Sequence, residues 1–314
     1  MTTPHPPARQ PIALLGALVV AAALAGTVLP ARAAPRRAAA KVAPAAGAAA
    51  AAPLCAPARP PRFAPGESFK YRLDLLGADV GTFEIQIERP PAGAQKAAAV
   101  LLRSRTRTNA FVTTNVGRYE AFSESLIGRE LSPISYREEI DEGDAHRTQA
   151  VEFPPRGDQL AVRITLNGKP EDLSLGATPS ARDMLSAWLA IRGTALVVGT
   201  PFCSEVYAAK QMWRVTGAVA AKEQLETPLG SFQTARLDTM ATRADDPKIV
   251  RKAHFWVTDD PRRLPVVAIA EVKGKTVRAQ LVDVIGPNAP PRSPRKTPRE
   301  EAHSGSGSAP IGRR

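Results

Sequence analysis

The sequence is poor in the residue types that most often carry chemistry. Its 314 residues include only two cysteines and four histidines, and aromatic residues make up 5% of the chain. It contains no Gly-x-Ser-x-Gly elbow, no phosphate-binding glycine loop, no Gly-x-Gly-x-x-Gly run, no His-Glu-x-x-His and no Cys-x-x-Cys. These absences remove the common signatures of hydrolases, nucleotide-binding enzymes and redox proteins. We therefore predict a protein that is not an enzyme and needs no cofactor.

The few histidines also argue against a metal centre. Between the terminal segments only His146 and His254 remain, about a hundred residues apart and both in strand-like stretches. A structural or catalytic metal needs several ligands at suitable spacing, so no metal site is expected. The acidic groups of residues 137–144 and the Asp259-Asp260 pair are expected in turns and on solvent-facing sides of strands.

The scarcity of aromatic residues argues against a carbohydrate platform. The three tryptophans, Trp188, Trp213 and Trp256, are instead expected in the core.

The net charge of +12 comes mostly from the two ends of the chain. Residues 1–59 carry six basic groups and no acids, and residues 287–314 carry six basic groups against two acids. The segment between them holds 30 basic and 28 acidic groups, so it is nearly neutral. No nucleic-acid partner is expected. The basic ends could contact an anionic lipid or cell-wall surface weakly, or could simply be solvated.

The N-terminus is typical of an exported protein. Arg9 precedes an apolar run over 12–29, and Ala31-x-Ala33 supplies the small residues of a signal-peptidase site. We predict a signal peptide over 1–33 and a periplasmic location; an uncleaved membrane anchor is the alternative. Cys55 lies too far beyond the apolar run to carry a lipid, so the protein is not expected to be a lipoprotein.

Two flanking segments have the composition of linkers. Residues 34–60 are rich in alanine and proline and show no periodic pattern, which indicates a linker. Residues 287–314 are basic and rich in proline, serine and glycine, which indicates a disordered tail. The folded domain is predicted over 61–286.

Cys55 and Cys203 are the two cysteines. In an oxidising compartment a pair of cysteines is usually bonded, and this bond would join the start of the domain to its middle. The alternative is two unpaired small apolar residues.

Most of the domain alternates between apolar and polar residues, which is the pattern of half-buried strands. Phe69, Tyr71 and Leu73 share one face of the first segment, and the segment after a Gly-Ala-Asp-Val-Gly turn repeats the pattern. Several further strands follow, with turns rich in glycine, aspartate or asparagine. The short connections predict antiparallel pairing.

One segment, Thr178–Gly193, breaks the alternation and predicts a helix. Its apolar residues recur at three- and four-residue spacing, Ser180 is a candidate N-cap and Gly193 ends the pattern. The fold class is therefore mainly β: a large curved antiparallel sheet or incomplete barrel of about a dozen strands, with one amphipathic helix on its inner face. The residues expected to line a ligand cavity under the helix are Met184, Leu185, Trp188, Leu189 and Ile191.

An arginine stripe follows one strand. Arg103, Arg105 and Arg107 share one side of the segment 97–108 and are candidate contacts for a phosphate or carboxylate. The alternative is an outer face on which these arginines pair with nearby glutamates such as Glu120 and Glu124.

Four segments together carry a resemblance. They occur in this order over about residues 61–285: the opening FAPGESFKYRLDLLGADVGTFEI, the helix DMLSAWLAIRG, and the later ETPLGSFQTARL and FWVTDDPRRLPV. They resemble a bacterial envelope family known as domain of unknown function 3108, with Asp183, Ser186 and Arg192 in the places of that family's helix motif. The strand, tryptophan, turn and Leu-Pro of the last segment are also similar to periplasmic lipoprotein-carrier and sigma-regulator folds. Those are curved sheets that shelter an apolar ligand beneath helices, a likeness of fold that does not transfer function.

We therefore expect an exported, non-catalytic protein that binds or carries an apolar or amphiphilic component of the envelope, for instance a lipid. The alternative is a structural or interaction domain that docks an envelope protein. A filled sheet interior together with an exposed apolar edge would favour the alternative.

Overall fold

The computed structural model describes residues 62–155, 159–272, 275–287 and 289–290. The predicted signal peptide and linker lie outside these residues, as does nearly all of the predicted tail, so these three remain predictions. No helix within the described residues is long and apolar enough to cross a membrane.

The described residues form one sheet of fifteen strands, more than the dozen predicted. The charged strand β8 and the two-residue strand β9 lack the alternation that marks the others, which is why the sequence did not reveal them. In chain order the strands are β1 (Ser68–Leu75), β2 (Ala78–Glu88), β3 (Ala98–Thr108), β4 (Tyr119–Gly128), β5 (Pro133–Glu142), β6 (Ala145–Glu152), β7 (Gln159–Leu166), β8 (Lys169–Gly176), β9 (Ala181–Arg182), β10 (Pro201–Ala208), β11 (Gln211–Thr227), β12 (Gly230–Arg243), β13 (Val250–Thr258), β14 (Pro265–Val272) and β15 (Lys275–Ile285).

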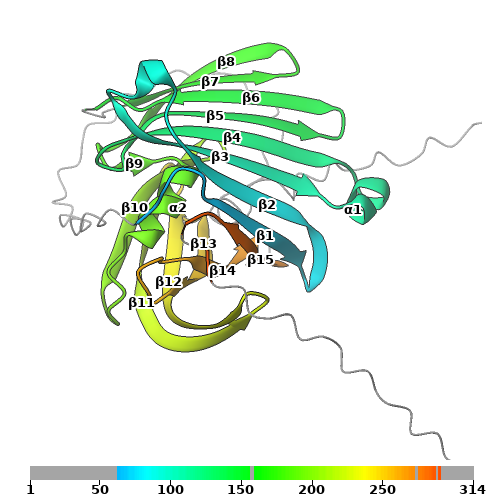
Figure 1. Ribbon diagram of the computed structural model, residues 1–314. Helices are drawn as coiled ribbons and strands as arrows, with labels where there is room; N and C mark the ends of the chain where they lie inside the picture. Colours follow the sequence, from blue (N-terminus) through cyan, green and yellow to red (C-terminus); the bar gives the residue numbers. More distant parts are fainter. Residues whose placement is uncertain (1–61, 156–158, 273–274, 288, 291–314) are drawn as a thin grey trace, which may run out of the picture.

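The sheet is curved and open. Its spatial order is β8-β7-β6-β5-β4-β3-β2-β1-β15-β14-β13-β12-β11-β10-β9. All neighbours are antiparallel except the short β9–β10 pair. The strands β2–β8 form one half and β9–β15 curl beneath them (Figure 1). Lys210 Nζ lies 2.9 Å from Glu171 Oε2, so edge strand β8 reaches the turn between β10 and β11. No strand pairing joins these edges in the described part of the chain.

The core follows from the alternation of the strands. Phe69, Tyr71 and Leu73 of β1 are fully buried, as the sequence predicted. Trp188 and Trp213 also lie in the core. Trp256 is half-buried and packs against the core, and its Nε1 donates to Glu223 Oε2 at 2.9 Å.

The predicted helix is shorter than expected and begins later. It is α2 (Met184–Arg192), and its N-cap is Asp183 rather than Ser180. The Asp183 carboxylate accepts hydrogen bonds from the backbone N–H groups of Leu185 and Ser186, whereas Ser180 bonds to Thr178. The helix lies inside the curl of the sheet against β3, β4, β9 and β10, as Figure 1 shows. This confirms a helix on the inner face.

Two further helical turns lie outside the core. Helix α1 (Ala110–Asn115) connects β3 to β4, with Asn109 as its N-cap, and η1 (Ala92–Ala94) lies between β2 and β3. Only Val112 of α1 is buried. Because α1 has a single buried residue, its sequence carries no helical periodicity and the sequence did not predict it.

The Asp-Asp-Pro-Arg-Arg corner between β13 and β14 is architectural. Asp260 Oδ1 accepts the backbone N–H of Arg262 at 2.8 Å, and Pro265 opens β14. Arg192 at the end of α2 donates to the Arg262 carbonyl at 3.0 Å and to the Arg62 carbonyl at 2.8 Å. One buried guanidinium therefore joins the start of the domain, the helix and the closing corner.

Candidate ligand-binding groove

The residues predicted to line a cavity under the helix are packed in the core instead. Leu185, Trp188, Leu189 and Ile191 are 0–3% exposed, and Met184 is half-buried. Trp188 Nε1 donates to the Tyr71 hydroxyl at 3.2 Å. The hollows described below have no α2 residue in their linings.

The helix is also fixed at both ends by buried charges. Asp183 Oδ2 accepts the Ser125 hydroxyl of β4 at 2.7 Å, and burial raises the pKa of Asp183. Arg192 Nη1 lies 3.6 Å from Glu67 Oε2, and burial lowers the pKa of Arg192. Unpacking α2 to admit a ligand would separate these groups from their partners.

Of the two predicted disulfide partners, only Cys203 can be placed. It is a half-buried residue of β10. Cys55 lies outside the described residues, so the Cys55–Cys203 bond remains a prediction.

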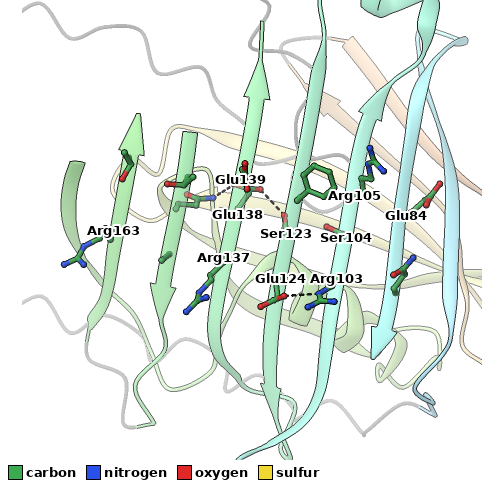
Figure 2. Close-up of a pocket in the computed structure, with 16 residues that line it drawn as sticks. Glu84, Arg103, Ser104, Arg105, Ser123, Glu124, Arg137, Glu138, Glu139 and Arg163 are labelled. Carbon is green, nitrogen blue, oxygen red and sulfur yellow. Dashed lines mark hydrogen bonds and ion pairs between the residues drawn. The ribbon is translucent and has the colours of Figure 1, made fainter. Parts of the chain in front are cut away.

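A groove of about 690 Å³ crosses the outer face of β2–β7. Twelve of its lining residues point away from the core and stand in two neighbouring cross-strand rows (Figure 2). The arginine row comprises Gln86, Arg103, Glu124, Arg137, Ala150 and Arg163. The phenylalanine row comprises Glu84, Arg105, Phe122, Glu139, Thr148 and Thr165.

The strand register explains both the rows and the hollow. Outward residues recur every second position, so directly paired residues on successive strands line up across the sheet. On β6 and β7 the rows contain the short side chains Thr148, Ala150 and Thr165. Longer arginine and glutamate side chains on β2–β5 stand beside them. We attribute the groove to this change in side-chain length.

Two of the three arginines in the predicted stripe line the groove, and both are already paired. Arg103 donates from Nε to Glu124 Oε2 and from Nη1 to Glu88 Oε2, both at 2.9 Å. The Arg105 guanidinium pairs with Glu120 and lies 4.9 Å from the centre of the Phe122 ring. These pairs match the alternative in which the stripe is a paired outer face. Arg107 is on the same face but outside the groove lining.

Arg137 is the groove arginine that the sequence analysis missed. It is exposed, and it has no hydrogen-bond or ion-pair partner within the described residues. Within the described part of the chain Arg163 pairs only with the exposed Asp172 of the edge strand, at 3.0 Å. In the sequence each is a single arginine at an outward position of its strand, and only the register places them in line with Arg103.

Beneath the groove the inner face of the same strands carries a buried polar cluster. Glu138 of β5 accepts the Tyr136 hydroxyl at 3.0 Å and an N–H of the Gln149 amide, and Gln149 in turn accepts the Tyr207 hydroxyl at 2.9 Å. Burial raises the pKa of Glu138. Because Tyr207 belongs to β10, this cluster joins the two halves of the curl. Its members are buried, so we assign it to the architecture.

A second hollow, of about 760 Å³, lies at the turns that join β4 to β5 and β6 to β7. Ile134, Phe153 and Leu160 contribute to its lining. It borders residues 156–158, which lie outside the described residues, so its full outline is not defined. The groove over β2–β7 is built entirely of described strands and is the better candidate.

No curated protein matches the sequence significantly. Among solved structures, a beta-barrel-like protein of domain of unknown function DUF1849 from Brucella abortus is similar over 70% of this chain and 96% of its own. Its sequence identity is 12% and its TM-score 0.49. A candidate exported protein with a YmcC-like fold from Bacteroides fragilis is similar over 74% of this chain and 100% of its own, at 10% identity and a TM-score of 0.31.

The sequence itself gives a more specific match. The family model described as protein of unknown function (DUF3108) matches residues 70–282. This range covers β1 to β15, including α2 and the closing corner, and agrees with the resemblance seen in the sequence motifs. The chain is a member of the DUF3108 family.

Proposed function

We propose that this protein is a non-catalytic binding protein of the bacterial envelope. Its ligand is an elongated anionic amphiphile that lies in the outer groove of β2–β7. The observation that carries the proposal is Arg137, an exposed guanidinium without a protein partner among the described residues, inside a groove that also exposes Phe122.

The arginine row supplies the anion contacts. Arg103, Arg137 and Arg163 lie on every second strand, and neighbouring strands are about 4.8 Å apart, so successive guanidinium groups start about 10 Å from one another. A guanidinium binds phosphate or carboxylate oxygens through paired N–H donors. Glu124 is the one acid in this row. The row therefore favours a ligand with more than one anionic group or an extended anionic head.

The phenylalanine row supplies the apolar contacts. Phe122 is 42% exposed, and the methyl groups of Thr148 and Thr165 continue the row across β6 and β7. An alkyl or isoprenoid chain lying on this row would remove the Phe122 ring from water. The ligand is thus bound on the surface of the sheet, and not beneath α2 as the sequence suggested.

Export is part of the proposal and is supported by the predicted signal peptide over 1–33. Fractionation of cells that express the full-length chain should recover a shortened protein in the periplasm. Recovery of the uncleaved chain in the membrane fraction would favour the anchor instead.

The binding test uses short-chain phosphatidylglycerol as the anionic probe and short-chain phosphatidylcholine as the zwitterionic one, both below micelle formation. Isothermal titration of the exported protein should show preference for the anionic probe. Arg137→Gln should weaken this binding about tenfold, since a hydrogen bond to a charged group contributes about 1.5–3 kcal/mol. Arg214→Gln is the control, because Arg214 is an exposed arginine on β11, outside the groove. Equal affinities for both probes, or equal loss in both variants, would contradict the proposal.

A docking domain for another envelope protein is the second candidate, favoured by the packed interior. Edge strand β8 pairs only with β7 among the described strands and offers its free edge for strand addition. Pro170 and the charged residues of β8 oppose such pairing. A protein partner that is retained by the Arg137→Gln variant, together with absent lipid binding, would favour this candidate.

A further inference from the structure

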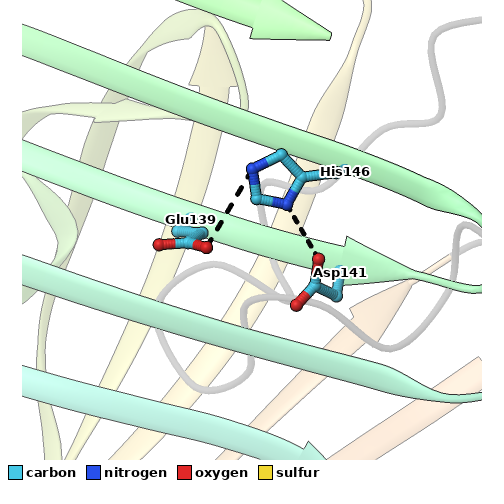
Figure 3. A group of neighbouring side chains, drawn as sticks. All are labelled: Glu139, Asp141 and His146. Carbon is cyan, nitrogen blue, oxygen red and sulfur yellow. Dashed lines mark hydrogen bonds and ion pairs between the residues drawn. The ribbon is translucent and has the colours of Figure 1, made fainter. Parts of the chain in front are cut away.

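A compact group of metal-ligand side chains spans the phenylalanine row and the cross-strand row beside it. Asp141 of β5 and His146 of β6 are directly paired in the hairpin register, and Glu139 precedes Asp141 by two residues on the same face. His146 Nδ1 lies 2.8 Å from Asp141 Oδ1, and Nε2 lies 4.0 Å from Glu139 Oε1, as Figure 3 shows. One ligand atom from each residue lies within 4.8 Å of the other two.

We propose that Glu139, Asp141 and His146 form a binding site for a divalent transition-metal ion of the Zn²⁺ type. An imidazole nitrogen with two carboxylate oxygens is a ligand set that zinc accepts. Three protein ligands leave further coordination positions for water or for an exogenous ligand. The sequence argument expected no metal site because it sought ligands at short linear spacing, whereas strand register brings these three together.

The backbone holds the ligands near one another before any ion binds. All three stand on the β5–β6 hairpin, whose two strands pair without irregularity from Ser135–Glu152 to Glu142–Ala145. Directly opposite residues have Cβ atoms about 4.5–5.5 Å apart, so small rotations of the side chains suffice to bring three ligand atoms around one ion. Little ordering is therefore required on binding.

Neither carboxylate forms a direct ion pair with an arginine within the described residues. His146 is the only hydrogen-bond or ion-pair partner of Asp141 and Glu139 within the described residues. On the same face Glu120 is different, because Arg105 and Arg118 both pair with it. Charge that is unneutralised by the protein remains available to a cation.

The chain contains a matched pair that lacks the third ligand. His254 Nδ1 of β13 lies 2.7 Å from Asp238 Oδ1 of β12, which is the same cross-strand arrangement. Here Asp238 also pairs with Arg236 at 3.0 Å, and no third acid completes a group within the described residues. We therefore expect no metal site at His254.

The test is titration of Zn²⁺ into the exported protein after treatment with a chelator. The protein is purified through an affinity tag that contains no histidine. We expect one saturable site that His146→Gln weakens at least tenfold, since loss of even an outer-shell partner of a metal costs about 10–100-fold. Asp141→Asn and Glu139→Gln should weaken it too, and His254→Gln should not. Circular dichroism will show that each variant is folded.

Unchanged binding in His146→Gln, equal loss in both histidine variants, or no saturable binding at all would overturn the proposal. Glu139 also belongs to the groove lining, but the metal site requires no groove ligand. His146 is outside the groove lining, so its substitution separates a failure of the metal site from a failure of the proposed function.

Discussion

Replacing Asp183 tests how α2 is held inside the sheet. Its Oδ1 accepts two backbone N–H groups, from Leu185 at 2.7 Å and from Ser186 at 3.0 Å. Its Oδ2 accepts two hydroxyls, from Ser125 at 2.7 Å and from Ser186 at 3.0 Å. In Asp183→Ala the hydroxyls can rotate, but both N–H groups stay buried without an acceptor. Each such loss costs about 1–3 kcal/mol, so we expect a loss of about 3–5 kcal/mol of unfolding free energy.

Asp183→Asn is the informative companion. The amide oxygen can keep both backbone bonds, and the amide nitrogen can donate to the two serine hydroxyls, which also accept. The neutral amide avoids the burial cost that raises the pKa of Asp183. We expect a change within about 1 kcal/mol, because the number of hydrogen bonds is conserved.

Urea unfolding at neutral pH, followed by the fluorescence of buried Trp188 on α2, measures both variants. An equally large loss in Asp183→Asn and Asp183→Ala would refute the hydrogen-bond argument, and would show that the negative charge itself is required.

Three other predictions address the packing and the charges. Gly217→Ala should destabilise the β11–β12 pair by several kcal/mol, because the added Cβ would lie 2.1 Å from the Asp238 carbonyl oxygen; thermal unfolding close to that of the parent would contradict this. Arg192→Leu should cost about 3–5 kcal/mol, because it breaks the buried ion pair with Glu67 and removes the donor to the carbonyls of Arg62 and Arg262; adding Glu67→Gln should recover part of the loss in urea unfolding. Hydrogen bonds from arginines hold the pKa of Glu120 below its usual value. Glu120 therefore stabilises the fold above its unfolded pKa, and this stability is lost as pH falls through the lower folded value. In Glu120→Gln the free energy of unfolding should fall less steeply as pH decreases through the acid range than it does in the parent protein. The same pH dependence in both proteins would contradict the assignment.

The sequence predicted the fold best in segments with one buried face, because burial there imposes a regular spacing of apolar residues. The alternation of Phe69, Tyr71 and Leu73 gave the opening strand, and the three- and four-residue spacing around Trp188 gave the helix. Strand β8 was not predicted, because it is an exposed edge strand whose side chains share no buried face. The N-cap was misplaced because Ser180 and Asp183 are both good capping residues, and only tertiary contact with Ser125 decides between them.

The candidate site was harder to predict for a different reason. Arg103 and Arg105 could be picked out because they alternate on one strand, but Arg137 and Arg163 belong to other strands. The groove is a property of the register across β2–β7, which no single segment encodes. The helix residues looked like a ligand face because a stripe that packs into a core and one that lines a cavity have the same periodicity.

The central claim is that the ligand lies on the outer groove and not under α2. A photoreactive anionic phospholipid, irradiated with the purified protein and mapped by peptide mass spectrometry, tests this directly. The account predicts cross-links around Phe122 and along β3–β7, which Arg137→Gln should reduce. Cross-links concentrated on α2, and unaffected by that variant, would contradict it.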